Sequence, residues 1–175
     1  MSPDGRYASH GTGELELERF KKLGANVVFE PGSLVFHPET ISMGSNIYVG
    51  HYAILKGYYS SEMHIGDDTW IGQQCMFHSG GGLRIGSRVG IGPGVRILTS
   101  QHQDLGRDVP LVSSPVIPAE VVIEDECNIG WGSIIMPGVR LGRGTLVGAG
   151  SVVTNDVAPY SVIAGVPAKL LRTRS

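Results

Sequence analysis

The sequence of 175 residues carries 14 Lys and Arg against 16 Asp and Glu, which gives a formal net charge of -2 and a pI of about 6.3. This balance gives no reason to expect binding to nucleic acid or to an acidic membrane. The length fits a single domain, 1–175, and two cysteines are too few for a disulfide framework. The polar segment 1–13 has no apolar signal core and no stretch is long enough to span a membrane, so we expect a cytoplasmic protein without membrane insertion.

The first expected element is a short helix over 14–23. This segment reads ELELERFKKL and ends before Gly24, a residue type common just beyond helix ends. Because a repetitive structure follows, we expect the helix to act as a cap over the first turn of that structure.

From residue 25 the chain repeats with a period of six. Its 26 glycines alone would favour disorder, but 41% of the residues are hydrophobic, many of them Ile and Val, and this favours short strands joined by tight corners. Aliphatic residues followed by glycine open successive hexads: Ile65-Gly66, Ile71-Gly72, Ile85-Gly86, Ile91-Gly92, Ile129-Gly130, Leu141-Gly142 and Val147-Gly148. A period of six excludes a helix and is a multiple of the strand period of two.

The hexads predict an all-β protein, a parallel β-helix over 25–158 in which three short strands make one triangular coil of about eighteen residues. The register gives about six coils, which begin at residues 25, 43, 65, 85, 123 and 141. At about 4.8 Å per strand layer the prism would be roughly 29 Å tall. Cys75 and Cys127 fall at inward positions two coils apart and on different faces, so we expect two small core residues and no disulfide.

Three breaks in the register follow the third strand of a coil. They insert residues 61–64, 83–84 and 103–122, so all of the extra chain is expected to emerge at one edge of the prism. This favours a built-up pocket wall, although corners also tolerate passive insertions. The protruding loop 103–122 is long enough to suggest a lid or wall over a ligand. A C-terminal tail, 159–175, is expected to leave the prism through Pro159 and Pro167.

Three stretches carry a resemblance to a known family. They run from Ile85 to His102, from Val147 to Asp156 and from Val162 to Lys169. In these residues the chain resembles the hexapeptide-repeat acyltransferases, closest to the sugar and xenobiotic O-acetyltransferases of the galactoside and maltose acetyltransferase type. The resemblance covers about residues 43–172. It implies a left-handed β-helix, acetyl-CoA as the acyl donor, no metal, and a homotrimer with active sites between neighbouring prisms.

His102 is the candidate general base. It stands at the end of its coil, where the long loop leaves, and a hydroxyl acceptor needs a base of near-neutral pKa to take its proton. The residues alone leave a surface histidine equally open; the resemblance favours the base, because the family places its catalytic histidine before a long loop. His78, one coil earlier, is a candidate substrate-binding residue across an interface or an ordinary surface histidine.

The resemblance places the donor site in the last coils and the tail. Gly148 and Ala149 leave the backbone accessible to an extended pantetheine arm. The remaining candidates for contact with coenzyme A are Trp131, Thr154, Asn155, Lys169 and Arg172. Trp131 is expected to point outward, and Lys169 and Arg172 would suit the nucleotide phosphates.

The function expected from these features is transfer of an acetyl group from acetyl-CoA to a hydroxyl of a sugar or sugar-like small molecule by direct attack. Alternatives remain open, because one fold houses many functions. They are N-acetylation of an amino sugar, possibly nucleotide-linked, and a non-catalytic β-helix scaffold. A zinc enzyme of the same fold is disfavoured, since no second histidine accompanies His102 in the following loop.

Overall fold

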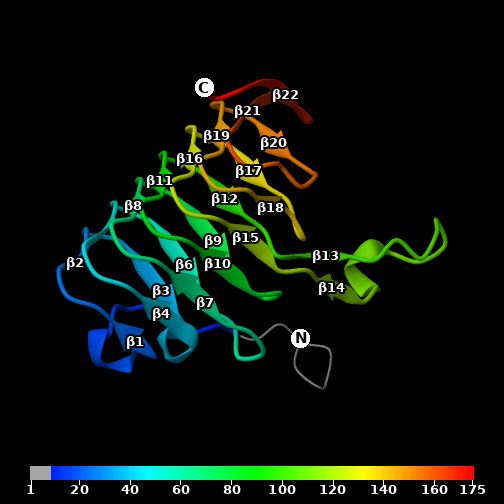
Figure 1. The fold of residues 1–175 in the computed structure, drawn as a ribbon. Coiled ribbons are helices and arrows are strands. Elements are labelled where there is room, and N and C mark those ends of the chain that lie inside the picture. Colours follow the sequence, from blue (N-terminus) through cyan, green and yellow to red (C-terminus); the bar gives the residue numbers. More distant parts are fainter. Residues whose placement is uncertain (1–8) are drawn as a thin grey trace.

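The computed structural model describes residues 9–175 as a triangular β-prism whose long axis runs from the N-terminal to the C-terminal end of the chain (Figure 1). Three parallel sheets, here called A, B and C, form its sides, and every coil passes through them in that order. The chain is a left-handed β-helix with almost no helix among the described residues. The predicted all-β fold class is therefore confirmed.

Each sheet takes one strand from each coil. Sheet A contains β1 (Lys22–Leu23), β4 (Ile41–Met43), β7 (Met63–Ile65), β10 (Leu83–Ile85), β15 (Val121–Ile123) and β18 (Arg140–Leu141). Sheet B contains β2 (Val27–Phe29), β5 (Ile47–Val49), β8 (Trp70–Ile71), β11 (Gly90–Ile91), β16 (Asn128–Ile129), β19 (Leu146–Val147), β21 (Ser161–Gly165) and β22 (Ala168–Thr173). Sheet C contains β3 (Leu34–Phe36), β6 (Ile54–Lys56), β9 (Met76–His78), β12 (Arg96–Ile97), β17 (Ile134–Ile135) and β20 (Val152–Val153). Coils 1 to 6 are numbered from the N-terminal end.

The remaining elements lie outside the three sides. β13 (Ser100–His102) and β14 (Val116–Pro118) pair as a separate antiparallel ribbon, which projects from the prism in Figure 1. Three short 3-10 segments complete the chain: η1 (Leu17–Arg19), η2 (Pro38–Thr40) and η3 (Leu111–Ser113).

Strand pairing holds equivalent residues of successive coils above one another. Ile85 lies between Ile65 of the coil below and Ile123 of the coil above. Because every second residue of a strand points inward, these columns fill the prism with aliphatic side chains that are almost completely buried. Phe77 is the largest side chain with less than 2% exposure. The predicted hexad register is thus the register of the core.

Corner glycines are required by the close approach of the next coil. A Cβ at Gly66 would lie 2.6 Å from the carbonyl carbon of Gly86, and one at Gly86 would lie 2.7 Å from the backbone nitrogen of Asp125. Such distances are far below ordinary contact, so a side chain at these positions would push two coils apart. This steric limit explains why glycine follows the aliphatic residue that opens so many hexads.

The predicted helix over 14–23 is wrong. Only Leu17–Arg19 forms a single 3-10 turn, and Lys22–Leu23 is already strand β1, which pairs with Ser42 and Met43 of the next coil. A ten-residue helix gains little by itself in water, whereas strand pairing satisfies the backbone groups of residues 22–24 at once. Phe20 covers the open end of the core instead and packs against Phe29, with ring centroids 5.7 Å apart.

The prism also has about seven turns where six were predicted. Coil 1 starts at Lys22, and an incomplete seventh turn follows coil 6, in which Val157 bridges to Leu141 and β21 pairs with β19. The tail therefore does not leave the prism at Pro159, as expected, but adds one more layer to sheet B. After Pro167 the chain turns back and β22 runs antiparallel to β21.

The two long insertions emerge at one edge, as predicted. Within coils 1 to 6, the two longest connections both run from sheet C to sheet A: 57–62 after coil 2 and 98–120 after coil 4. Segment 79–82 after coil 3 is as short as an ordinary corner, and the two extra residues of that coil, 83–84, lie in β10. We call this side the C–A edge. The opposite corner, where sheet B meets sheet C, has only tight turns and is called the B–C edge.

The core predicts a large effect of truncating Phe77. Phe77→Ala should lower the free energy of unfolding by about 3–5 kcal/mol, because it removes a fully buried ring and leaves a cavity that stacked coils cannot close. Urea denaturation measures the change. Leu170→Ala, at a side chain that is 63% exposed, is the matched control and should change stability by less than about 0.5 kcal/mol; equal effects of the two would contradict the register.

Candidate active site

A hollow at the C–A edge gathers residues from three separate parts of the chain. It has a volume of about 350 Å³ and lies between segment 57–62 and the base of the ribbon β13–β14. Its lining consists of Tyr58, Tyr59, Ser60, His78, Gly80, Ser100, Val116 and Pro118. We call this the tyrosine hollow. It combines apolar and aromatic walls with several hydroxyl groups, which is typical of a small-molecule site.

His78 occupies one wall of the tyrosine hollow. It is half-buried in β9, directly above Lys56 of β6, and its ring centroid lies 5.4 Å from that of Tyr58. Burial, together with the nearby positive charge of Lys56, lowers the pKa of His78 below its ordinary value. His78 is therefore a neutral imidazole at pH 7, suited to donate and accept hydrogen bonds and not to carry charge.

His102 lies on the projecting ribbon, which we call the arm (100–118). The expectation that it ends a stacked coil is wrong: the chain leaves the prism two residues earlier, at Ser100, because β13 pairs with β14 and not with the neighbouring coils. The base of the arm is fixed, since buried Thr99 bonds the backbones of His78, Gly81 and Ala119.

His102 faces the same way as the residues that line the hollow. Alternate residues of a strand share a face, and Ser100, two positions before His102, lines the hollow. Val116, the cross-strand partner of His102, lines it too. The exposed imidazole therefore lies at the outer rim of the tyrosine hollow.

A backbone carbonyl sets the tautomer of His102. Nδ1 lies 3.0 Å from the carbonyl oxygen of Ser114, and because a carbonyl only accepts, Nδ1 must donate its hydrogen. Nε2 of the neutral ring then carries the free lone pair. Ser114 is buried at 6% exposure and its hydroxyl donates to the carbonyl of Leu111 at 2.6 Å, which fixes the acceptor. The arm thus presents an imidazole oriented as a proton acceptor.

The upper part of the B–C edge is a row of exposed corners with bare backbone, which we call the glycine trench. Gly94, Gly132 and Gly150 follow one another at this corner in coils 4, 5 and 6, each with a positive φ. A Cβ at Gly132 or Gly150 would meet no atom within 4 Å, so the trench is open to solvent. In coils 2 and 3 the same corner carries Tyr52 and Gln74, which close its lower end.

Four of the candidate donor-site residues border the glycine trench. The indole of Trp131 is 68% exposed, as expected, and packs over Gly92, where a Cβ would come within 2.6 Å of its Cδ1. Gly148 and Ala149 form the same corner one coil higher, and the N–H of Gly150 donates to the carbonyl of Trp131 at 2.8 Å. Lys169 follows at the upper end, since it pairs with Ala164, the residue above Gly148.

The other three donor candidates lie elsewhere. Thr154 and Asn155 follow β20 and are exposed at the C–A edge, where the Asn155 amide donates to the Thr154 hydroxyl at 3.0 Å. Arg172 is exposed on β22, next to Val162 on the face of sheet B. Within one chain, the width of sheet C separates Thr154 and Asn155 from the glycine trench.

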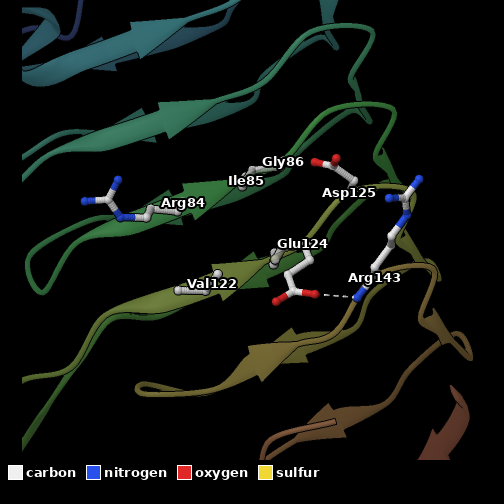
Figure 2. A pocket seen from close by; sticks show the side chains of 8 residues that line it. Arg84, Ile85, Gly86, Val122, Glu124, Asp125 and Arg143 are labelled. Carbon is white, nitrogen blue, oxygen red and sulfur yellow. Dashed lines mark hydrogen bonds between the residues drawn. The ribbon is translucent and has the colours of Figure 1, made fainter. Parts of the chain in front are cut away.

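A further hollow, on sheet A, has a different character (Figure 2). It measures about 400 Å³ and is bordered by Arg84, Glu124, Asp125 and Arg143. Its arginines already have partners: Arg84 pairs with Glu120 at 2.8 Å, and Arg143 pairs with Glu126 at 2.7 Å. Figure 2 shows the backbone nitrogen of Arg143 bonded to Glu124. This face is a ladder of internal ion pairs and offers no unpaired arginine to a ligand.

The two cysteines lie inside the prism, as expected. Cys75 and Cys127 are free and buried, and their thiols contact corner carbonyls of Gly92 and Gly142. Burial raises the pKa of each thiol to about 11. A thiolate is the reactive form, so neither residue is suited to act as a nucleophile.

Sequence reasoning missed part of this arrangement. The sequence does not mark Tyr58 and Tyr59 as site residues, because nothing in the hexad pattern shows that segment 57–62 folds against the arm. No sequence pattern marks Ser114 either, because it contacts His102 through its backbone carbonyl and not through its side chain. Gly94 and Gly132 carried a signal, because they repeat at the corner position of Gly150, but the repeat alone does not distinguish an open corner from a covered one.

Comparison with known families identifies the repeat. The profile described as the hexapeptide repeat of succinyl-transferase matches residues 120–155. A predicted acetyltransferase of Schizosaccharomyces pombe is 34% identical over 115 residues, which is 65% of this chain and 54% of that protein. A 2,3,4,5-tetrahydropyridine-2,6-dicarboxylate N-acetyltransferase of Staphylococcus aureus is 40% identical over 74 residues, 42% of this chain and 31% of that protein. The matches thus span about half or less of the length of these relatives.

Solved structures of similar shape cover most of the chain. An N-acyltransferase from Bacillus cereus, in complex with dTDP and 3-hydroxybutyryl-CoA, has a TM-score of 0.81 at 24% identity and covers 90% of this chain and 85% of that one. A hexapeptide-repeat acetyltransferase from Vibrio cholerae, complexed with acetyl-CoA, has a TM-score of 0.67 at 29% identity and covers 89% and 72%. The first of these shows a shared fold only.

Two kinds of feature are absent from the described residues, 9–175. These residues contain no group of three His, Cys, Asp or Glu side chains placed to hold a metal ion. They also contain no helix that is long and apolar enough to cross a membrane.

The cysteine environment predicts complete protection of both thiols. Native protein at pH 8 should react with neither Ellman's reagent nor iodoacetamide within minutes, because both thiols are buried and protonated, whereas protein in concentrated guanidinium chloride should titrate as two thiols. Ser175→Cys, at the exposed C-terminus, supplies the control and should react at once. Rapid labelling of the native wild-type protein would show that the inward placement is mistaken.

Proposed function

We propose that this chain, which belongs with the hexapeptide-repeat acyltransferases in repeat and fold, transfers an acetyl group from acetyl-CoA to a small sugar-like acceptor. His102 acts as the general base, and the glycine trench holds the pantetheine arm of the donor. The observation that carries the proposal is that the lower end of the trench and the rooted base of the arm lie at the same height of the prism.

The height follows from the coil numbers. The trench opens over coils 6, 5 and 4 and ends at Gly94, below which Gln74 closes the corner. The arm leaves at Ser100, directly after strand β12 of the same coil 4. A donor that enters beside Lys169 and runs down the trench would therefore deliver its thioester at the level of His102.

One chain does not contain both halves of the site. The trench lies at the B–C edge and the arm at the C–A edge, so sheet C separates them. In an assembly whose copies are related by rotation about an axis parallel to the prism, equivalent coils of all copies lie at the same height. If the sheet C sides face one another, the B–C edge of one copy lies beside the C–A edge of the next. We propose a homotrimer, the number that the family resemblance implies, in which each site takes its trench from one subunit and His102 from a neighbour.

The outer face of sheet C suits contact between copies. Its outward column carries half-buried apolar residues in five coils and the exposed Arg96 in coil 4; the apolar residues are Leu34, Ile54, Met76, Ile134 and Val152. Sheet A, by contrast, carries the ladder of ion pairs described above. An apolar face opposite a charged one favours sheet C as the side turned toward the neighbouring subunits.

The chemistry requires one proton acceptor. A hydroxyl of the acceptor attacks the thioester carbonyl and gives its proton to Nε2 of His102, while Nδ1–H remains bonded to the carbonyl of Ser114. The tetrahedral intermediate then collapses, the carbon–sulfur bond breaks, and the proton returns to the departing sulfur of coenzyme A. In this proposal four residues contact the donor along the trench: Trp131, Gly148, Ala149 and Lys169. Three more contact it from their separate positions: Thr154, Asn155 and Arg172. His78 contacts the acceptor.

N-acylation is the second candidate reaction, and the comparisons favour it. The sequence relative from S. aureus is an N-acetyltransferase. The B. cereus enzyme, whose likeness extends to the fold alone, is an N-acyltransferase with one structure that holds dTDP-4-amino-4,6-dideoxyglucose and coenzyme A. The same constellation serves an amine, because the attacking nitrogen also loses a proton as the amide forms. An amine that binds already deprotonated would depend less on His102.

Replacement of His102 tests the base. His102→Ala should lower kcat by about 10² or more, because the proton of the attacking group loses its acceptor, while the Kd for coenzyme A stays as in the wild type. The measurement is thiol release from acetyl-CoA with a panel of sugars, amino sugars and nucleotide sugars, together with calorimetric titration of coenzyme A. Undiminished turnover in the variant would exclude His102 as the base and favour an amine acceptor.

Mixing two inactive variants tests the shared site. Gly132→Asn places a side chain in the trench at a φ of 65°, which asparagine tolerates, and should abolish coenzyme A binding. Co-expressed with His102→Ala, it should restore about a quarter of wild-type activity per site in random trimers, since one site in four pairs an intact trench with an intact His102. Sites contained in single chains would give no recovery, because every chain carries one defect.

A further inference from the structure

The tyrosine hollow carries an inference about the acceptor itself, which rests on the proposed acyl transfer. We propose that Lys56 and the hydroxyl groups of this hollow bind a negatively charged group of the acceptor, so that the acceptor is a ring-bearing anion, either a phosphate ester or a carboxylate. A neutral free sugar would lack the group that the hollow recognises.

The tyrosine hollow has a positive charge nearby and no negative charge in its lining. None of its lining residues is acidic. Lys56 adjoins two of them: it pairs with His78 on the neighbouring strand, and its ammonium is 6.0 Å from the ring centroid of Tyr58. Among residues 9–175 no carboxylate pairs with Lys56. The two nearby glutamates are already engaged: Glu39 with His37 and Arg19, and Glu62 with Lys21 and His64.

The contrast with sheet A supports this reading. There each arginine beside the hollow faces a glutamate of the neighbouring coil, so the positive charge is neutralised within the protein. At the tyrosine hollow the side-chain polar groups besides His78 are hydroxyls, each of which can donate a hydrogen bond: those of Tyr58, Tyr59, Ser60 and Ser100. A site that offers an ammonium and several O–H groups, without a carboxylate, is complementary to an anion.

His78 adds a donor of fixed direction. Its Nδ1 accepts a hydrogen bond of 3.4 Å from the backbone N–H of Gly80, so that Nε2 of the neutral ring carries the hydrogen. The lowered pKa of His78, caused by its burial and by Lys56, keeps this form at pH 7. The imidazole therefore donates one hydrogen bond without adding a second positive charge.

The tyrosines supply a surface for a ring. Tyr58 and Tyr59 are stacked, with centroids 5.2 Å apart and planes inclined by 29°, and Tyr59 is 79% exposed. His37 stands 6.3 Å from Tyr59 and flanks the pair. An exposed aromatic face beside a cation favours a ligand in which a sugar or heterocyclic ring adjoins the charged group.

The position of the hollow limits the size of the acceptor. Lys56 belongs to coil 2, whereas the arm that carries His102 leaves from coil 4, two layers or about 10 Å higher. His102 faces the hollow from its rim, as derived above. An anionic group bound at the level of Lys56 therefore lies at least about 10 Å from the reacting hydroxyl or amine, which is farther than the span of one pyranose ring.

Calorimetry on the full-length protein tests the inference. Coenzyme A is titrated first, and uridine diphosphate, pyridine-2,6-dicarboxylate and uridine are then titrated with coenzyme A present, so that the donor's phosphate site is occupied. We expect at least one anion to bind at least tenfold more tightly than uridine. Preference for uridine diphosphate identifies a phosphate ester, and preference for the dicarboxylate identifies a carboxylate.

Two variants and a control assign the binding to the hollow. Lys56→Met should weaken anion binding about tenfold and Tyr59→Ser several-fold, while Lys22→Met, which removes an exposed lysine of sheet A, should leave it unchanged. The inference is overturned if uridine binds as tightly as both anions, if neither anion binds while coenzyme A does, or if Lys56→Met binds anions like the wild type. Failure of coenzyme A to bind would instead reject the acyltransferase proposal. The effect of Lys56→Met on anion affinity would still show whether the hollow binds an anion.

Discussion

The pairing of each coil with the coil beneath it is the constraint on which the rest of the structure depends. Parallel strands hold Ile65, Ile85 and Ile123 in one column, and the corners must let two backbones pass so closely that Gly66 and Gly86 have no room for a Cβ. The stack fixes the position of every residue by coil and by corner. Chain that does not fit the hexad register has to leave the prism, and it leaves at the C–A edge.

This geometry divides the chemistry between two edges. The B–C edge stays regular, and over coils 4 to 6 its glycines expose a backbone trench bordered by Trp131. The C–A edge carries the irregular chain, which builds the tyrosine hollow and the arm. His102 gains its orientation from the carbonyl of Ser114, twelve residues along the chain, and its height from Thr99 at the arm's base. The rigid stack of coils thus fixes the height of each residue along the prism, while the inserted segments carry the side chains of the proposed acceptor site.

The sequence was sufficient to predict the hexad repeat and the structural features that follow from it. The hexads predicted the β-helix, the inward columns, the buried cysteines and the common edge of the insertions, because each follows from a period that only stacked strands satisfy. The helix over 14–23 failed, since apolar spacing in ten residues does not show that Lys22 and Leu23 will pair with coil 2. The prediction that His102 ends a stacked coil was wrong for a similar reason. β13 pairs with β14 inside the inserted segment and not with the neighbouring coils, and the sequence does not show this pairing. The tyrosine hollow joins residues 58–60, 78 and 116–118, and no local pattern reports that meeting.

The confinement of insertions to one edge also bears on how such a molecule can change over evolutionary time. Residues may be gained or lost between sheet C and sheet A without shifting the pairing of the stacked strands, so the wall proposed to meet the acceptor can vary in length and composition. The B–C edge does not tolerate such insertions, because its glycines hold the backbone of each coil in one conformation. If the proposed function holds, related prisms are expected to share the donor site at the B–C edge and to differ in the chain at the C–A edge that meets the acceptor.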